Sequence, residues 1–301
     1  MLCSLLGIKD KRWAKNEYVQ RNINPFIMGA SKKRLVEAPS DELKRIQSKI
    51  KTGLSKCHFP NFVYSGIKGK SYVDNAKEHQ GRKYVYKIDI SAFFPNTPRD
   101  RVYQFYRYQL NTSPDVAEML TNFSTSDLDR DYSTKSSVEK FIIGKGIRYN
   151  NHLCTGSPAS PLLSFLVNQP MFEEMLSLCK SRNICMTVYV DDVFFSSEYR
   201  IDDYFRRRIV EIVAKYGYKI SPKKVRYYNK CETKKVTGVI IREDGTTAIP
   251  NRLQRKVVDH VNSSSNEDVK TLRGCVVAAR QIDPAAFPSI IGSLKEKGLM
   301  R

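Results

Sequence analysis

Hydrophobic positions in the N-terminal half of the chain change from helical to strand spacing. After Ser40, apolar residues recur every three or four positions as far as Leu54, which predicts a helix capped by the serine hydroxyl. Residues 84–90 alternate between apolar and polar side chains, as a half-buried strand does. A Thr-Pro pair then supplies a cap and a first-turn proline for a helix predicted over residues 97–111.

Residues 111–150 break this regularity. They are polar, with runs of Ser and Asp, and we expect a loop-rich insertion there. The segment 156–158 opens a further helix, which we expect to bend at Pro170. Residues 201–216 place their apolar side chains on one face and are followed by a glycine, which predicts an amphipathic helix.

The remaining predicted strands come in pairs. Residues 185–190 and 193–197 are apolar runs that meet at an Asp-Asp pair. Residues 234–241 and 246–250 flank a Glu-Asp-Gly turn and predict a hairpin. From Pro250 onward the chain is basic, polar and helical in pattern. Strands and helices mix without a regular βαβ rhythm, which predicts an α+β fold with an antiparallel sheet.

The chain carries a large positive charge. Its 51 Lys and Arg residues exceed its 31 Asp and Glu residues, giving a net charge of +20 over 301 residues. Such an excess favours an anionic partner, either nucleic acid or an anionic membrane, over a merely soluble basic protein. The basic residues form clusters interleaved with aromatics, and these clusters are Lys32-Lys33-Arg34, Arg206-Arg207-Arg208 and Lys223-Lys224.

Cysteine usage and hydropathy bear on the compartment. The 7 cysteines are irregularly spaced, which indicates free thiols in a reducing environment rather than a disulfide framework. The apolar stretch over residues 2–8 is too short for a signal-peptide core, and no run approaches the ~18 apolar residues of a membrane span. We therefore expect a soluble cytoplasmic protein with no membrane partner.

Three aspartates stand where strand interiors are expected. Asp191 and Asp192 interrupt the apolar run 187–195, and Asp89 lies within the strand predicted over 84–90. An Asp-Asp pair by itself indicates a solvated turn, but flanking apolar strands and a third carboxylate favour a site occupied by cations. Hard divalent cations prefer carboxylate oxygen, and two Mg²⁺ ions roughly 4 Å apart can serve phosphoryl transfer.

At this point the sequence resembles the reverse transcriptases, whose catalytic blocks occur here in the same order over residues 25–250. Lys32-Lys33-Arg34 and the segment 38–47 resemble the fingers entry segment. KIDISAFFPNT resembles the first catalytic block, GSPASP the segment under the template and incoming nucleotide, YVDD the second catalytic block, and GYKISPKK the block that follows the primer-side helix.

Two short elements resemble the bacterial retron reverse transcriptases in particular. Residues 75–79 match an Asn-Ala-x-x-His element and residues 236–238 match a Val-Thr-Gly element. Two departures from many reverse transcriptases are visible. Thr155 stands where Gln commonly precedes the Gly-Ser-Pro block, which puts its contact with the incoming sugar in doubt, and Ser221 stands where Asn is usual.

The resemblance implies a right-hand polymerase fold of α+β class, with fingers, an antiparallel-sheet palm and a helical thumb. The implied fingers are residues 1–86, to which an insertion at 111–155 returns. The implied palm comprises 87–110 and 156–245, and the implied thumb is 246–301. We expect the insertion and the thumb to recognise the cognate RNA.

The resemblance also implies the roles of site residues. The catalytic residues are Asp89, Asp191 and Asp192, and the metal site consists of Asp89, Ile90, Asp191 and Asp192. The nucleotide-binding residues are Arg34, Phe94, Thr155, Gly156 and Lys224. The primer- and template-binding residues are Asn75, His79, Tyr189, Val190, Thr237, Gly238, Arg252, Arg255 and Lys256.

Some of these roles have simpler alternatives. Phe94, expected to select deoxynucleotides under the sugar, has the alternative of a core aromatic. Arg34 and Lys224, expected to meet phosphates, have the alternatives of a solvated loop and a surface lysine. Asn75 and His79 are expected to orient the template or active-site backbone, and a neutral core histidine is the alternative for His79.

The implied activity is RNA-directed DNA synthesis with two Mg²⁺ ions per active site and deoxynucleoside triphosphates as substrates. The retron type implies copying of a cognate structured noncoding RNA, priming from a 2′-hydroxyl of that RNA, a branched RNA-linked DNA product, and antiphage defence with an effector protein. The alternatives are another bacterial reverse transcriptase, intron-encoded or of a stand-alone defence type, and a catalytically idle RNA-binding protein on the same fold.

Overall fold

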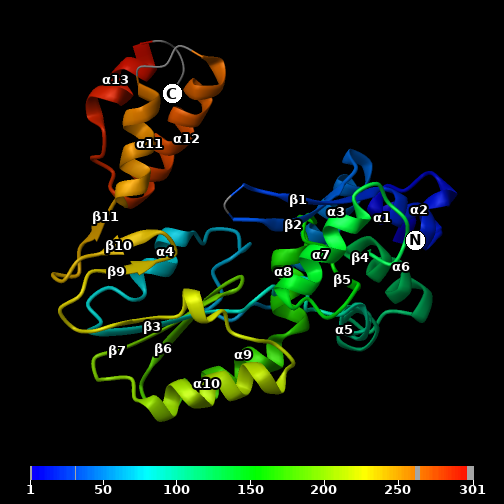
Figure 1. Cartoon of the computed structure of the whole chain (residues 1–301), viewed down its shortest axis with the longest axis horizontal. Coiled ribbons are helices and arrows are strands. Elements are labelled where there is room, and N and C mark those ends of the chain that lie inside the picture. Colours follow the sequence, from blue (N-terminus) through cyan, green and yellow to red (C-terminus); the bar gives the residue numbers. More distant parts are fainter. Residues whose placement is uncertain (1, 31, 262–264, 297–301) are drawn as a thin grey trace.

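The computed structural model describes residues 2–30, 32–261 and 265–296. Its centre is a four-stranded antiparallel sheet, called here the central sheet, with the order β6-β7-β3-β8 (Figure 1). Its strands are β6 (Cys185–Tyr189), β7 (Asp192–Ser197), β3 (Tyr84–Asp89) and β8 (Arg226–Tyr228). The strands predicted at 84–90, 185–190 and 193–197 are confirmed, as is the antiparallel arrangement.

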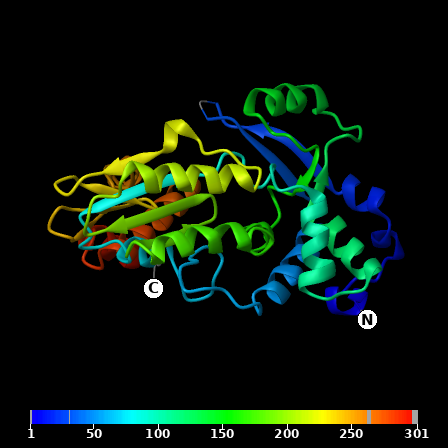
Figure 2. The ribbon, with the colours of Figure 1, turned by 90° about the horizontal axis from the view of Figure 1, so that it is seen from below.

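The two faces of the central sheet have different neighbours because side chains alternate along each strand. Ile88 and Phe195 belong to the main hydrophobic core, which includes the buried side of α9 (Gln169–Lys180) and α10 (Asp203–Lys215). Figures 1 and 2 show these two helices along one face of the sheet. Val85 and Phe194 pack in a second core on the opposite face. Asp89 therefore lies on the face away from α9 and α10, because it shares the strand parity of Val85.

The second core is covered by α4 (Tyr72–Lys77) and a three-stranded sheet of the order β11-β10-β9. Its strands are β9 (Lys234–Val236), β10 (Val239–Ile241) and β11 (Thr247–Ala248). The prediction of one strand over 234–241 is wrong, since the chain reverses at Thr237 and Gly238, whose φ angles are 44° and 89°. Two consecutive residues with positive φ angles close a tight two-residue hairpin turn, and a glycine adopts a positive φ at little energetic cost.

An N-terminal unit flanks the central sheet. It contains the hairpin β1 (Ile23–Met28) and β2 (Arg34–Pro39), whose strands run sideways in Figure 1, above α8. The helix predicted after Ser40 is α3 (Asp41–Leu54), and the Ser40 hydroxyl accepts a 3.3 Å hydrogen bond from the Leu43 N–H. The helices before β1 are α1 (Leu2–Leu6), the 3₁₀ helix η1 (Lys11–Ala14) and α2 (Asn16–Arg21).

Residues 111–150 are more regular than their composition predicts, so the expectation of a loop-rich insertion is wrong. They form α6 (Pro114–Ser124), β4 (Thr125–Asp127) and α7 (Lys135–Lys145), and β4 pairs with β5 (Asn151–Leu153). α7 buries only two of its own side chains, Val138 and Ile142, in a small core that includes Leu35 of β2. A helix stabilised by so few apolar contacts leaves a weak periodic pattern, and its packing on β1 is a tertiary effect.

Two predicted helices are divided in the structure. The one expected over 97–111 consists of α5 (Arg99–Gln104) and a π-helical turn, η2 (Phe105–Gln109), with Pro98 as the N-cap residue rather than in the first turn. The bend expected at Pro170 is a break at Asn168 between α8 (Ser160–Val167) and α9. The short 3₁₀ helix η3 (Pro222–Lys224) precedes β8.

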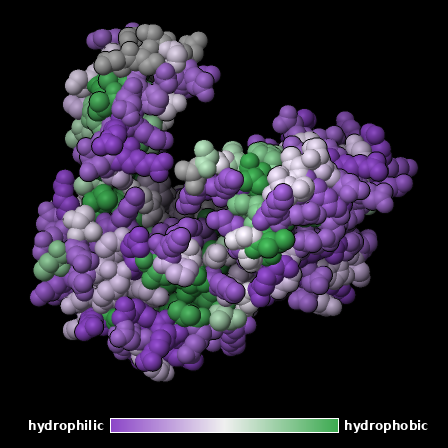
Figure 3. All heavy atoms as spheres, in the orientation of Figure 1, coloured by the Kyte–Doolittle hydropathy of each residue, from purple (hydrophilic) through white to green (hydrophobic). Residues whose placement is uncertain are grey.

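The C-terminal unit consists of α11 (Asn251–Val261), α12 (Asn266–Ile282) and α13 (Pro288–Glu296), which confirms the helical prediction for this segment. It has its own small core around Val257 and Val276. Figure 3 shows a hollow between this unit and the N-terminal unit, above the central sheet. Residues 262–264 and 297–301 of the predicted thumb lie outside the described residues.

The described part of the chain contains no helix with the length and apolar content that a bilayer crossing requires. The thiols of all 7 cysteines are free, as their spacing predicts.

Candidate active site

The turn between β6 and β7 brings Asp191 to the end of β3. The Ile90 N–H donates a 2.8 Å hydrogen bond to the Asp191 carbonyl oxygen. Val190 in this turn has a φ of 59°, which is strained for a β-branched residue, and its N–H donates to the Ser65 hydroxyl at 3.2 Å. The neighbouring segment therefore holds the turn in a backbone conformation that the valine would not adopt by itself.

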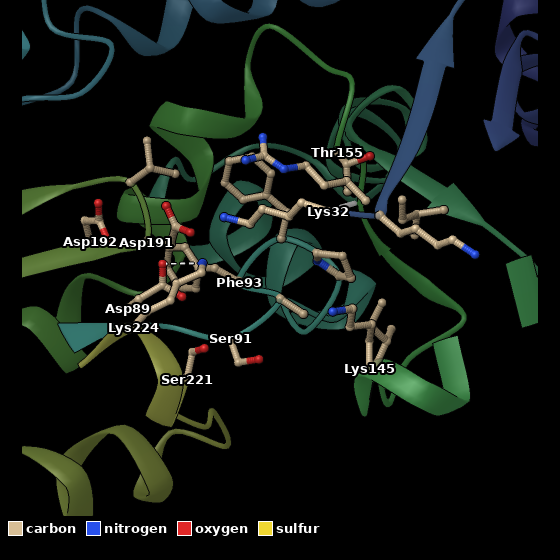
Figure 4. Close-up of a pocket in the computed structure, with 18 of the residues that line it drawn as sticks. Lys32, Asp89, Ser91, Phe93, Lys145, Thr155, Asp191, Asp192, Ser221 and Lys224 are labelled. Carbon is tan, nitrogen blue, oxygen red and sulfur yellow. Dashed lines mark hydrogen bonds and ion pairs between the residues drawn. The ribbon is translucent and has the colours of Figure 1, made fainter. Parts of the chain in front are cut away.

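The pairing of β3 with β7 brings the three predicted catalytic carboxylates together. Asp89 and Asp192 are direct partners across these strands, and Asp191 immediately precedes Asp192. Figure 4 shows the Asp89 and Asp191 side chains next to each other and Asp192 beside them. Segments about a hundred residues apart in the sequence thus form one acidic cluster.

Two lysines compensate part of this negative charge. Lys224 Nζ lies 2.5 Å from Asp89 Oδ2, and Lys87 Nζ lies 2.7 Å from Asp192 Oδ1. Burial, and next the charges of Asp89 and Asp192, raise the pKa of Asp191 to about 6. Burial also raises the pKa of Asp192, although the hydrogen bond and the charge of Lys87 oppose the shift. The two lysines are therefore paired with Asp192 and Asp89, and the negative charge of Asp191 is the least compensated of the three.

The residues fit a divalent cation. Oδ1 of Asp89 is buried and has no hydrogen-bond partner among the described residues, a costly state for a carboxylate oxygen. A cation at this point would satisfy that oxygen and relieve the charge crowding around Asp191. No three acidic, histidine or cysteine side chains in the described ranges already converge as metal ligands. Mg²⁺ typically uses one or two carboxylates together with substrate phosphates, which matches an acidic pair beside a basic cavity.

A cavity of about 610 Å³ opens beside the carboxylates. Phe94 lines it and is partly exposed, whereas Phe93 is buried against Phe172 and Tyr218. The predicted nucleotide residues Arg34, Thr155 and Lys224 also line the cavity. Its basic side chains come from the β1–β2 hairpin, β3, α7 and η3, and they are Lys32, Lys33, Arg34, Lys87, Lys145 and Lys224. Such a set of cations suits a polyanionic ligand.

Gly156 and Ile90 support the cavity without lining it. A Cβ on Gly156 would lie 2.1 Å from the Glu37 carbonyl oxygen, so only glycine allows this approach of the loop to β2. The Ile90 side chain is fully buried, and its residue contributes through the backbone hydrogen bond to Asp191.

The sequence reasoning missed three residues of this site. Lys87 lies two positions before Asp89, so strand periodicity could have placed both side chains on one face. Ser65 and Lys145 gave no such signal. Ser65 reaches the turn only because residues 62–64 run along β6, and Lys145 reaches the cavity only because α7 packs on the β1–β2 hairpin.

The two short elements that resemble retron enzymes meet in space. The Asn75 side-chain amide donates to the Thr237 hydroxyl at 3.4 Å, and this hydroxyl donates to the Tyr72 carbonyl oxygen at 2.6 Å. Asn75 is fully buried. The Asn-Ala-x-x-His and Val-Thr-Gly elements are therefore parts of one structural unit that joins α4 to the β9–β10 turn.

His79, in the same element, is fully buried on the face of the central sheet that carries Asp89. Its ring nitrogens lie 2.7 Å from the hydroxyls of Ser196 on β7 and Thr187 on β6. Burial, with a smaller effect from the charge of Arg82, lowers the pKa of His79 to about 3, so the ring is neutral. Neither the Asn75 nor the His79 side chain reaches the surface, so neither contacts primer or template directly, and both contact only the β9–β10 turn and the strands beside it.

A second groove of about 360 Å³ lies on the other side of Lys87 and Asp192. Tyr189, Thr237 and Gly238 line it, together with a set of basic residues, namely Lys87, Lys223, Lys224, Arg226 and Lys235. The predicted contacts of the C-terminal unit lie on the exposed face of α11, and they are Arg252, Arg255 and Lys256.

Residues 15–241 match the reverse transcriptase (RNA-dependent DNA polymerase) family. The chain belongs to this family. It is an RNA-directed DNA polymerase with a right-hand polymerase fold of α+β class, and its family generally uses divalent metal ions. The prediction made from the catalytic blocks is thereby confirmed.

Several curated relatives are retron reverse transcriptases. The retron Ec83 reverse transcriptase of Escherichia coli is 25% identical over 265 residues, which cover 84% of this chain and 80% of that protein. The retron Mx162 reverse transcriptase of Myxococcus xanthus is 24% identical over 287 residues, which cover 88% of this chain and 58% of that protein. These matches confirm the retron type that residues 75–79 and 236–238 predict.

A solved structure of a foamy viral protease-reverse transcriptase in complex with double-stranded DNA is similar in fold. The TM-score is 0.50 at 17% sequence identity, and the match covers 91% of this chain and 38% of the viral one. The likeness supports the polymerase fold of this reverse transcriptase.

Proposed function

We propose that this reverse transcriptase copies part of a cognate structured noncoding RNA into DNA by two-metal nucleotidyl transfer. The observation that carries this proposal is the cluster of Asp89, Asp191 and Asp192 at the mouth of a cavity rich in lysine and arginine. Metal-assisted phosphoryl transfer requires carboxylates that hold the metal ions next to cationic side chains that bind the phosphates. We further propose priming from a 2′-hydroxyl of the RNA, a branched RNA-linked DNA product, and a role in antiphage defence with an effector protein.

The incoming deoxynucleoside triphosphate is proposed to occupy the 610 Å³ cavity. Arg34, Lys32 and Lys33 would bind its phosphates, with Arg34 able to bind two oxygens at once. Phe94 would lie under the sugar and exclude a 2′-hydroxyl, and the Thr155–Gly156 backbone would support the nucleotide from the side of β2. These assignments place phosphate and sugar contacts on different elements of the same cavity.

The chemical step is an in-line displacement at the α-phosphorus. A primer hydroxyl oxygen forms the new P–O bond, the bond to the bridging oxygen breaks, and pyrophosphate leaves with that electron pair. Asp89, Ile90, Asp191 and Asp192 would hold two Mg²⁺ ions, which lower the pKa of the attacking hydroxyl and neutralise the leaving group. Lys224, now paired with Asp89, is positioned to turn toward the triphosphate when that carboxylate has another partner.

The primer and template are proposed to lie along the 360 Å³ groove and the C-terminal unit. Tyr189, Val190, Thr237 and Gly238 would contact the primer end. Arg252, Arg255 and Lys256 on α11 would hold the backbone of the hybrid duplex, as A-form duplexes are held mainly through backbone and shape.

We propose fingers, palm and thumb that follow the predicted division, with one adjustment. The N-terminal unit with the 111–155 segment forms the fingers, the central sheet with 87–110 and 156–245 forms the palm, and 246–301 forms the thumb. The adjustment concerns residues 62–86, since 62–64 run along β6 and α4 packs on β6 and β10. These residues belong by contact to the palm.

Purified protein with the cognate RNA, deoxynucleotides and Mg²⁺ should synthesise short DNA joined to the RNA. The double variant Asp191→Asn with Asp192→Asn should bind the RNA with unchanged affinity and make no DNA. A matched control is Asp203→Asn with Glu211→Gln, which removes equal charge from the exposed face of α10 and should retain synthesis. Synthesis by the first double variant at the wild-type rate would refute the proposed site.

A further inference from the structure

Glu37 is a fully buried acidic residue in β2, at a distance from the acidic cluster. Its partner is His152 of β5, which is also fully buried, with Nε2 2.9 Å from Glu37 Oε1. The two residues are 115 positions apart in the sequence. A carboxyl and an imidazole in such a location are costly unless each satisfies the other.

The hydrogen bonds define the protonation of this pair. Nδ1 of His152 lies 2.6 Å from the Tyr149 carbonyl oxygen, which can only accept, so Nδ1 carries a proton. A second proton lies between Nε2 and Glu37 Oε1. Burial opposes both charges, yet the charge and hydrogen bond of His152 lower the pKa of Glu37, and those of Glu37 raise the pKa of His152. The pair is therefore ionic, with both ring nitrogens protonated.

The second carboxylate oxygen of Glu37 extends this network to the cavity. It accepts a 2.7 Å hydrogen bond from the Thr155 backbone N–H, and the Glu37 N–H donates to the Thr155 hydroxyl at 3.0 Å. The Cys154 thiol lies 3.5 Å from the Glu37 carbonyl oxygen, and Gly156 passes directly over the same carbonyl. Residues 154–156 thus contact Glu37 through two hydrogen bonds of Thr155 and through the close approach of Cys154 and Gly156 to its carbonyl oxygen.

This attachment connects the two sides of the proposed nucleotide site. Arg34 lines the cavity and lies three positions before Glu37 on β2, and Thr155 lines the cavity from the loop before α8. The bond from the Thr155 N–H to Glu37 therefore joins a cavity-lining residue of the loop to the strand that carries Arg34.

We propose that Glu37 is a positioning residue for nucleotide binding, with its carboxylate oriented by His152 and bonded to the Thr155 backbone. The inference rests on the proposed function, because it assumes that the cavity holds the incoming nucleotide. Glu37 touches neither substrate nor metal in this scheme. Its loss should therefore weaken nucleotide binding more than it slows the chemical step.

Two substitutions separate positioning from charge. Glu37→Gln can keep every bond, since its amide can donate to a neutral His152 ring and its oxygen can accept from Thr155. Glu37→Met removes both bonds at similar volume. In primer extension on an RNA template with an annealed DNA primer, Glu37→Met should raise KM for the deoxynucleotide by about tenfold, with kcat changed less than about threefold. Glu37→Gln should restore KM to within about threefold of wild type.

Gln20→Met is the matched control for general damage to the fingers. Gln20 is also buried and makes two hydrogen bonds to backbone, at 3.2 Å to the Thr125 oxygen and 2.9 Å from the Asp127 N–H, but it does not line the cavity. Both Gln20→Met and Glu37→Met should lower Tm, because each removes two buried hydrogen bonds, but Gln20→Met should leave KM for the nucleotide unchanged. An equal rise of KM in both variants would overturn the proposal, and so would an unchanged KM in Glu37→Met.

Should Glu37→Met not fold, Glu37→Asp serves in its place. The shorter acid keeps its charge but cannot reach His152 and Thr155 together, so KM should still rise, and a wild-type KM would overturn the proposal. If the wild-type protein extends the primer and neither Glu37→Met nor Glu37→Asp alters KM, only the positioning role is refuted. Absence of extension by the wild-type protein would refute both the proposed function and this inference.

Discussion

The proposed palm and the proposed fingers each contain a fully buried histidine, and the two rings carry different charges. His79 packs on the central sheet, between the hydroxyls of Ser196 and Thr187, and is neutral. His152, in the fingers, lies between a carbonyl oxygen and the Glu37 carboxylate and is protonated. A hydroxyl can donate or accept and so satisfies a neutral ring, whereas two acceptors require two protons.

The comparison also concerns what each histidine holds. His79 joins the segment after α4 to two strands that lead to the catalytic carboxylates, on the same face of the sheet as Asp89 and Asp192. His152 orients an acid that bonds directly to a cavity-lining residue. We infer that the palm network preserves the catalytic geometry as part of general stability, while the fingers network adjusts substrate affinity.

The largest expected difference between the two regions is in the chemical step. Asp89→Asn removes a proposed metal ligand and the ion pair with Lys224, so DNA synthesis should fall by a factor on the order of 10³ or more. Single-turnover extension at saturating nucleotide measures this rate. Asp100→Asn on the exposed side of α5 is the control. Residual synthesis within tenfold of wild type would place the metal site elsewhere.

The second expected effect is on the stability of the palm. His79→Leu leaves the Ser196 and Thr187 hydroxyls buried without the ring as partner, which should lower the free energy of unfolding by about 3 kcal/mol. Urea denaturation followed by circular dichroism measures this loss. A decrease below about 1 kcal/mol would mean that the hydroxyls find other partners and that His79 is not the link proposed here.

The third prediction uses pH, because the two histidines should respond to it in opposite directions. The pKa of His79 in the folded protein is about 3 against an ordinary 6.5, so the unfolded chain binds the extra proton as pH falls. Relative to His79→Gln, the wild type should lose about 2 kcal/mol of stability between pH 7 and pH 5.

The pair of Glu37 and His152 should behave differently. The lowered pKa of Glu37 contributes stability above about pH 4.5, which is lost as pH falls through its folded value. The raised pKa of His152 contributes stability below about pH 6.5, which is lost as pH rises through its folded value. Relative to the double variant Glu37→Gln with His152→Gln, wild-type stability should be greatest between these two limits, decline at lower pH as Glu37 is protonated, and decline at higher pH as His152 loses its proton. An advantage that grows steadily from pH 6.5 to pH 9 would contradict the ionic pair.

The smallest effect is expected for Lys145, the cavity lysine supplied by α7. It is exposed and makes no ion pair among the described residues, so Lys145→Ala should raise KM for the nucleotide by only about threefold. Lys140→Ala on the same helix, outside the cavity lining, should leave KM unchanged. Equal effects of the two substitutions would show that α7 acts only through its general positive charge.

Much of the fold could be predicted from local pattern. The strand that carries Asp89, the helix capped by Ser40 and the amphipathic helix before Gly217 follow from side-chain periodicity and capping. α7 and the turn at Thr237–Gly238 could not be predicted in this way. The first buries few apolar residues, and the second reverses a run that reads as continuous strand.

The sequence by itself determined the family, the order of the catalytic blocks and the three aspartates, because these depend on residue identity and local spacing. Only the tertiary structure decided which distant residues act together. It paired Asp89 with Asp192, joined Asn75 to Thr237, and put Glu37 between His152 and Thr155. It also gave the two buried histidines different protonation states, since the protonation of an imidazole depends on the atoms that surround it in the folded chain.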